Sequence, residues 1–284
     1  MTFFSGNIYC VPCAMFRFVD DDGKYVDTHK CIPGAITITF GEMVENHARM
    51  EQIGHNIDEG FSCSEIRKMS RKLNKIGISN KIINLGDYID EEVDEASVLI
   101  IRNGVDLLGN GGDANRVLRE CTKGEWSWDK KAFMYGRVVN KKARWNVCMA
   151  DFEQTPEYEN GKGSVVDFRQ LPILSKIRTV LPKYLGRKAN NLLAEGNYYY
   201  NTNDCGIGFH GDSERKIVIG VKLGVSIPLH YQWYHKNKPV GKRCTLNFGH
   251  GDMYVMSEKA TGNDWKKSSQ YTLRHAAGCK KYTT

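Results

Sequence analysis

The sequence has no apolar run that approaches the roughly 18 residues of a membrane-spanning helix. Its first sixteen residues lack the basic segment of a secretory signal peptide. The nine cysteines are an odd number, scattered from Cys10 to Cys279, which suits a reducing compartment better than a disulfide framework. We therefore expect an intracellular protein without membrane association, and we find no internal repeat and no low-complexity segment.

The composition is that of a globular protein. Hydrophobic residues make up 41% of the 284 residues and charged residues 26%, which fits one large domain or two ordinary ones. The formal net charge of +7 is moderately basic. A charge of this sign favours a polyanionic partner such as nucleic acid without requiring one.

Residues 1–95 have the pattern of a separate, smaller α+β domain, whose role the sequence does not indicate. Residues 15–27 predict a hairpin, and Ala35–Phe40 alternates like a strand. Residues 62–77 predict an amphipathic helix with a capping box of Ser62 and Glu65 and an apolar stripe of Ile66, Met69, Leu73 and Ile76. The acidic stretch Asp87–Ala96 marks the expected boundary.

Residues 96–284 are predicted to form a second, larger domain. Two segments rich in basic and aromatic residues flank the turn at 140–142, which predicts a β-hairpin over 132–152. A short amphipathic helix is expected over 171–181, ending near Pro182. From Leu192 onward, short glycine-bounded strands follow one another without helices, as in a barrel or a jelly roll.

The stretch "GFHGDSE" places His210 and Asp212 two residues apart, so on a strand both side chains point the same way. With one distant histidine such a pair makes the 2-His-1-carboxylate triad of non-haem Fe(II) oxygenases. We predict that His275 is the third ligand, because a late strand of a double-stranded helix runs beside the strand that bears the pair. The other downstream candidates are His230, His235 and His250.

The same region resembles the AlkB-type 2-oxoglutarate/Fe(II) dioxygenases, particularly their eukaryotic DNA-demethylase branch. The resemblance covers roughly residues 96–284 and is most specific over 192–223. The shared pattern consists of Asn197-x-Tyr199, Asp204, Ile207-Gly208, His210-x-Asp212 and Glu214.

This resemblance implies a C-terminal double-stranded β-helix (jelly-roll) core with flanking helices, in an α+β chain. It implies that His210, Asp212 and His275 bind Fe(II), and that Asn197 and Tyr199 contact 2-oxoglutarate. Glu214 would lie near the substrate base, and the predicted hairpin occupies the place of the family's nucleotide-recognition hairpins, with Tyr135, Arg137, Arg144 and Trp145 as substrate-binding candidates. The implied reaction consumes O2 and 2-oxoglutarate and demethylates or hydroxylates alkylated bases, as in DNA repair.

One departure from the family concerns the co-substrate. The family ends in a strand with two arginines, one of which binds the distal carboxylate of 2-oxoglutarate, but no arginine follows His275 here. Lys280 and Lys281 are the basic residues available, and Lys281 aligns best with the missing arginine. A lysine binds a carboxylate as a point charge, with less defined geometry. The anchor of the co-substrate therefore stays open.

Several alternatives remain. Cys10, Cys13, His29 and Cys31 have some of the spacing of a zinc site, but they fit no known zinc-finger pattern, and a hairpin with buried thiols explains them better. We interpret Glu45 and His47 as structural polar groups. The substrate could instead be a protein side chain or a small molecule. A third hypothesis is a non-catalytic nucleic-acid-binding protein with a degenerate oxygenase fold. We expect a monomer.

Overall fold

The computed structural model describes residues 18–19, 25–26, 34–109 and 113–284. At its start, β1 (Phe18–Val19) and β2 (Tyr25–Val26) pair as antiparallel strands, which confirms the strands of the predicted N-terminal hairpin. The turn of that hairpin and the four residues of the zinc candidate lie outside the described residues. Within the described part of the chain, no helix is long and apolar enough to span a bilayer.

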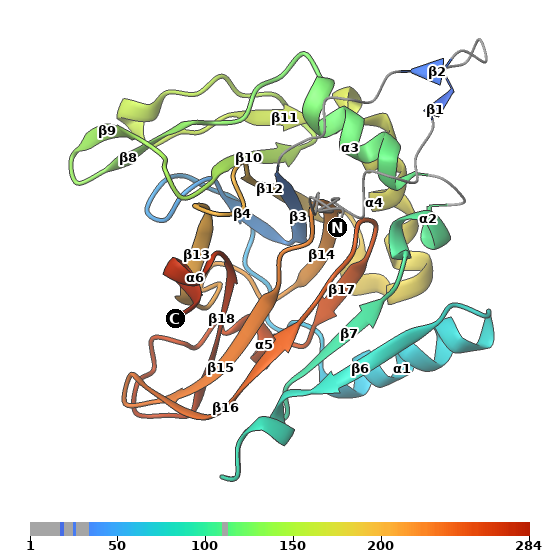
Figure 1. Ribbon diagram of the computed structural model, residues 1–284, viewed down its shortest axis with the longest axis vertical. Coiled ribbons are helices and arrows are strands. Elements are labelled where there is room, and N and C mark those ends of the chain that lie inside the picture. The colour runs from blue at the N-terminus through green and yellow to red at the C-terminus, as the bar shows by residue number, and fades with distance from the viewer. Residues whose placement is uncertain (1–17, 20–24, 27–33, 110–112) are drawn as a thin grey trace, which may run out of the picture.

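The fold is mixed α+β, with a large, mostly antiparallel sheet between a layer of helices and a smaller sheet (Figure 1). The large sheet has eight strands, in the spatial order β11 (Val165–Asp167), β10 (Trp145–Ala150), β12 (Leu193–Tyr199), β3 (Ala35–Gly41), β14 (Val218–Gly224), β17 (Met253–Met256), β7 (Ser97–Ile101) and β6 (Asn80–Asn84). Its β10–β11 pair is parallel. The small sheet has four strands, in the order β13 (Gly206–His210), β18 (Thr272–Gly278), β15 (Leu229–His235) and β16 (Lys238–Leu246).

Two short antiparallel ribbons and a few helices complete the architecture. The ribbons are β4 (Met43–Glu45) with β5 (Gln52–Gly54), and β8 (Lys131–Met134) with β9 (Arg137–Asn140). The α-helices are α1 (Cys63–Lys75), α2 (Gly104–Leu108), α3 (Ala114–Lys123), α4 (Pro172–Leu185), α5 (Glu258–Thr261) and α6 (Lys280–Thr283). Short 3-10 turns are η2 (Leu85–Tyr88), η3 (Tyr158–Asn160), η4 (Phe168–Gln170) and η5 (Arg187–Ala189).

The large sheet buries apolar side chains on both faces. On the helical side, α1, α3 and α4 pack against alternate residues of its strands, which in β3 are Ile36, Ile38 and Phe40. On the other side, a second core joins it to the small sheet, through residues such as Tyr199, Tyr254, Tyr231 and Trp233. Because side chains alternate along a strand, Thr37 and Thr39 of β3 belong to this space between the sheets.

Helix α1 begins as the sequence predicts. The Ser62 hydroxyl accepts a hydrogen bond from the Glu65 amide (3.1 Å), and the Glu65 carboxylate accepts one from the Ser62 amide (2.8 Å). Such a capping box stabilises a helix by about 1 kcal/mol. Ile66 and Leu73 are buried as expected, whereas Ile76 lies beyond the last helical residue and is 53% exposed.

The expected domain boundary near residue 95 is wrong for the described residues. Strand β3 pairs along its whole length with β12 on one side and β14 on the other, so it lies inside the large sheet. Strand β6 pairs with β7 across the same boundary. Apolar alternation indicates which face of a strand is buried but not which strand lies beside it, so the sequence suggested a separate unit.

The hairpin predicted over 132–152 is also wrong, because the chain does not turn at 140–142 as the sequence suggested. The chain reverses at Tyr135 and Gly136, both with positive φ (54° and 74°), between β8 and β9. Two residues of positive φ form the turn that matches the twist of a hairpin. Strand β10 pairs instead with β11 and β12 in the large sheet.

Candidate metal centre

His210 and His275 lie opposite each other on the neighbouring antiparallel strands β13 and β18. The register of the pairing shifts between Ile207 and His210, and an irregularity of this kind changes the direction of the side chains that follow it. Asp212 follows β13 directly, and its backbone N–H donates to the Thr261 carbonyl (3.0 Å). The small sheet thus brings the two predicted histidines together with the aspartate.

Gly211 allows this close approach. A Cβ at Gly211 would lie 1.9 Å from the carbonyl oxygen of Gly262, so no larger residue fits without moving the backbone. The chain between His210 and Asp212 is therefore pressed against the loop that precedes β18. This contact fixes the carboxylate in front of the two imidazoles.

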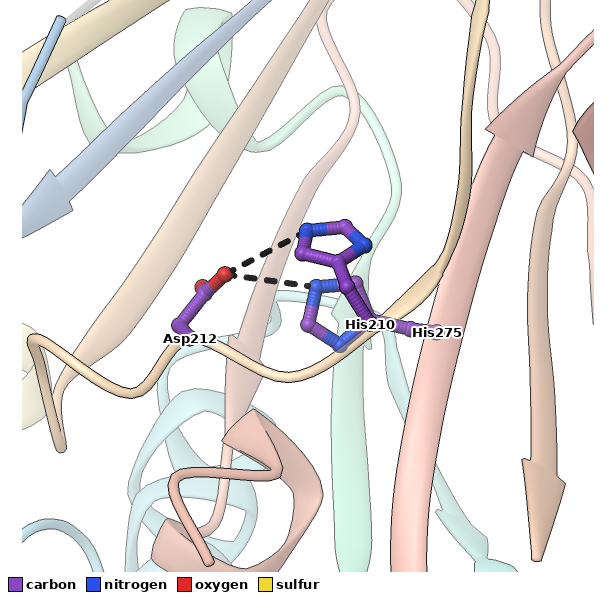
Figure 2. A group of neighbouring side chains, drawn as sticks. All are labelled: His210, Asp212 and His275. Carbon is purple, nitrogen blue, oxygen red and sulfur yellow. Dashed lines mark ion pairs between the residues drawn. The ribbon is translucent and has the colours of Figure 1, made fainter. Parts of the chain in front are cut away.

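The three side chains point toward one another, as Figure 2 shows. The Nε2 atoms of His210 and His275 lie 3.5 and 3.6 Å from the same carboxylate oxygen of Asp212. One nitrogen or oxygen atom from each residue lies within 4.8 Å of the others. Two imidazoles and a carboxylate on one side are the donor set of a facial metal site, and they leave the opposite side open to other ligands.

The surroundings favour the protonation states that bind a cation. Burial opposes ionisation of Asp212, but His275, His210 and the Arg215 guanidinium hold its pKa well below the ordinary value. Burial lowers the pKa of His275, and the adjacent His210 lowers it further. The His210 Nδ1 donates to the Gly208 carbonyl (2.8 Å), so that Nε2 is the ring nitrogen that faces Asp212.

Asp212 adjoins a network of buried charged side chains centred on Arg215. The Arg215 guanidinium donates to Glu214 through Nε (2.9 Å) and Nη2 (2.7 Å), and Nη2 also pairs with Glu195 of β12. Its Nε lies 3.9 Å from Asp212. Glu214, predicted to lie near a substrate base, is thus committed to an arginine that the sequence analysis did not single out.

The predicted co-substrate residues Asn197 and Tyr199 lie on the face of β12 that is turned toward the small sheet. The Asn197 side-chain oxygen accepts hydrogen bonds from Arg144 (2.6 Å) and Asn146 (2.7 Å), and its amide donates to Glu195 (3.0 Å). Tyr199 is buried in the core between the sheets, where burial raises its pKa to about 12. Both side chains therefore lie on one face of β12, and the hydrogen bond to Asn197 places Arg144 beside that face.

Lys280 and Lys281 do not reach this space. They lie at the start of α6, a short helix where the sequence predicted a final strand, and both are exposed. The Lys281 ammonium lies over the ring of Tyr282, 5.5 Å from its centroid. The structure therefore gives neither lysine the position of a co-substrate anchor.

The other predicted substrate residues lie on the β8–β9 ribbon and at the start of β10. Tyr135, at the β8–β9 turn, is 87% exposed, and Arg137 beside it is exposed. Trp145 stacks on Tyr200 with ring centroids 4.4 Å apart, and the Lys130 ammonium lies over the Trp145 ring, 4.4 Å from its centroid. Arg144 contacts Asn197, and Trp145 reaches the margin of the inter-sheet core through Tyr200.

The three other candidates for the third ligand have other contacts. His230 pairs with the Thr245 hydroxyl, His235 stacks on Tyr271, and His250 accepts from the Gly224 amide in a turn.

Glu45, interpreted from sequence as a structural group, has a pKa that burial raises to about 7, with Glu214 and Glu195 among its charged neighbours. It therefore lies at the margin of the buried acidic network.

Lys222 of β14, which is 6% exposed, is a further buried basic residue that was missed in the sequence. The available signal was a single lysine inside the apolar run 217–223, "IVIGVKL". A lone lysine in a strand is usually assigned to the solvent face. Here it lies on the face opposite to Val221 and Leu223, which pack toward the helices.

No protein-family model matches the chain. The chain is 46% identical over 255 residues to a protein of Acanthamoeba polyphaga mimivirus named "Uncharacterized protein R156". This similarity extends over 88% of the chain and 98% of the viral protein. The chain therefore belongs to the same family as uncharacterized protein R156 of the mimivirus.

Proposed function

We propose that the protein is an Fe(II)- and 2-oxoglutarate-dependent dioxygenase of the AlkB type that acts on alkylated bases in nucleic acid. The observation that carries this proposal is the convergence of His210, Asp212 and His275 from adjoining segments of one sheet. Two imidazole nitrogens and one carboxylate oxygen suit ferrous iron, and the partly exposed His210 leaves an approach from solvent. Bound there, iron with 2-oxoglutarate and O2 would supply oxidation of a substrate C–H bond, with succinate and CO2 as co-products.

The finer fold that we propose is a double-stranded β-helix with one strand taken from early in the chain. From β12 to β18 the strands pass between the two sheets: β12, β14 and β17 join the large one, and β13, β15, β16 and β18 the small one. A further strand after β18 would continue this alternation in the large sheet. The place between β12 and β14 is filled by β3, so we assign β3 the role of the final strand of the core.

The chain's own residues would prepare the reaction. The imidazoles and the ionised Asp212 would hold the cation, and Arg215 would keep that carboxylate oriented while balancing Glu195 and Glu214. The aromatic core between the sheets would keep water away from the reacting atoms. Three hydrogen bonds fix the Asn197 side chain. It would therefore contact a co-substrate without having to change its conformation.

Support for a nucleic-acid substrate comes from charge and from the β8–β9 ribbon. The net charge is +7, and the ribbon exposes Tyr135 beside Arg137. Aromatic and cationic side chains together suit stacking on bases and contact with phosphates. A base inside a duplex would have to be flipped out, at a cost of about a few kcal/mol.

The test is turnover of 2-oxoglutarate by the purified protein supplied with Fe(II) in air. We expect succinate release with the wild type and its loss in Asp212→Ala, with full retention in Asp90→Ala, a change at an exposed residue far from the site in sequence. Equal turnover in Asp212→Ala would contradict the assigned ligands. No iron uptake under anaerobic conditions would instead support the non-catalytic hypothesis.

The substrate class is tested separately. We expect formaldehyde from a panel of N-methylated oligonucleotides and not from a bulk methylated peptide panel. The opposite pattern would favour the protein-directed alternative, while the metal assignment would stand.

A further inference from the structure

Lys222 is a buried ammonium in the middle of the large sheet. It lies opposite Thr37 in the β14–β3 pairing and donates to the Thr37 hydroxyl (3.0 Å). Its nitrogen also lies 5.6 Å from the ring centroids of both Phe248 and Tyr254. Lysine is almost never fully buried unless it is paired, so this position requires an explanation.

No carboxylate among residues 34–109 and 113–284 provides that pairing. The pKa of Lys222 is lowered to about 8 by burial, with no acidic neighbour raising it. Asp252 at the end of the adjoining strand accepts hydrogen bonds from Arg102 and from the amides of Asn103 and Gly249. One hydroxyl and two aromatic faces are thus the described surroundings of a full positive charge.

Lys222 lies on the same side of the large sheet as the metal centre. Its neighbour Tyr254 interacts electrostatically with Asp212 and Tyr199. Tyr231 of the small sheet is close to both Tyr254 and Asp212, and its ring centroid lies 5.8 Å from that of His275. The ammonium and the metal ligands therefore lie on the same side of the large sheet, and both adjoin the aromatic core between the sheets through Tyr254 and Tyr231.

We infer that Lys222, together with the Thr37 hydroxyl, binds the distal carboxylate of a dicarboxylate co-substrate whose 2-oxo acid end faces the metal centre. This inference rests on the proposed function. The strand that we assign to the final position, β3, presents Ala35, Thr37, Thr39 and Gly41 on this face and no basic residue. The charge expected from that strand is supplied instead by the neighbouring one, β14.

The assignment also resolves the open choice between basic residues. Lys280 and Lys281 are exposed on α6, and Arg215 is already bound to Glu195 and Glu214. A carboxylate bound at Lys222 would remove the cost of its unpaired buried charge and would be enclosed by aromatic rings. Within the low-dielectric interior, such a pair is stronger than the same pair in water.

The experiment compares two ligands that differ only in the distal carboxylate. Protein loaded anaerobically with Mn(II) is titrated calorimetrically with 2-oxoglutarate and with 2-oxobutyrate, which lacks that group. We expect the wild type to prefer 2-oxoglutarate by about 10- to 100-fold, the effect of a hydrogen bond to a charged group. Lys222→Met should bind 2-oxobutyrate as the wild type does and lose this preference.

Two further variants sharpen the result. Thr37→Val, which removes only the hydroxyl, should lower the affinity for 2-oxoglutarate by about 3- to 10-fold. This variant tests the anchor independently if Lys222→Met does not fold. Lys281→Met should keep the full preference. An unchanged preference in Lys222→Met that still binds Mn(II) would overturn the anchor alone, whereas wild type that binds Mn(II) and neither acid would overturn the proposed function with it.

Discussion

At the scale of single residues, a buried lysine raises the free energy of the folded state. Burial lowers the pKa of Lys222 from 10.5 to about 8, which corresponds to on the order of 3 kcal/mol. Methionine has a similar length and no charge, although it loses the bond to Thr37, worth about 1 kcal/mol. We therefore expect Lys222→Met to stabilise the ligand-free protein at pH 7 by about 2 kcal/mol, measured by equilibrium urea unfolding.

The pH dependence of this gain follows from the two pKa values. Between about pH 8 and 10.5 the unfolded chain holds the lysine proton that the folded protein has released, so wild-type stability rises with pH in this window. The neighbouring Tyr254 stays neutral there, because burial raises its pKa. The gain in unfolding free energy of Lys222→Met over the wild type should be complete below pH 8 and should disappear toward pH 10.5. A gain independent of pH would mean that packing, not charge, is responsible.

At the scale of elements, the space around Lys222 depends on the contact between β14 and β17. A Cβ at Gly220 would lie 2.0 Å from Cζ and 2.2 Å from Cε1 of the Tyr254 ring, which covers this glycine. Gly220→Ala must displace the ring, and overpacking of this kind costs about 1–3 kcal/mol. We expect a lower midpoint in thermal unfolding and weaker 2-oxoglutarate binding, since the ring borders the ammonium.

A matched control lies in β13. A Cβ at Gly208 would have the Tyr282 carbonyl oxygen as its nearest contact, at an ordinary 3.7 Å. Gly208→Ala should therefore change stability by no more than about 0.5 kcal/mol. If both variants behave alike, the loss in Gly220→Ala reflects the backbone and not the tyrosine ring.

At the scale of the whole molecule, local signals were predictable and long-range pairing was not. The capping box of Ser62 and Glu65 is formed by residues three apart, so it is visible in the sequence. The pair His210 and Asp212 is also local, although Asp212 lies beyond the end of β13 and is held by its bond to Thr261. His275 was reached only by assuming the order of strands. The mixed α+β class with its run of short strands followed from periodicity.

The position of β3 required information that periodicity does not contain. The alternation of Ile36, Ile38 and Phe40 predicts one buried face, but nothing in these residues names β12 and β14 as neighbours 150 or more positions away. The burial of Lys222 could not be predicted for the same reason. A lysine in β14 becomes an interior charge only once β3 and Tyr254 lie beside it. The resemblance to a family whose last strand carries the co-substrate arginine pointed to Lys280 and Lys281 instead.

The position of β3 makes a prediction about where the chain can be divided. A fragment of residues 96–284 contains every residue of the proposed metal centre but lacks β3, which separates β12 from β14 in the sheet. Truncating any one of the buried side chains of Ile36, Ile38 and Phe40 to alanine would lower the free energy of unfolding by roughly 2–5 kcal/mol. The sum of these losses is comparable to the about 5–15 kcal/mol that stabilises a typical domain.

We therefore expect the fragment 96–284 to show no cooperative thermal transition in near-ultraviolet circular dichroism and to bind no Mn(II) at the site. Co-expression with residues 34–95 as a separate chain should restore both, because β3 can then add to the open position between β12 and β14. Cooperative unfolding of the fragment alone would mean that the large sheet closes without β3. In that case the early strand would be an addition to the core and Lys222 would need another partner than Thr37.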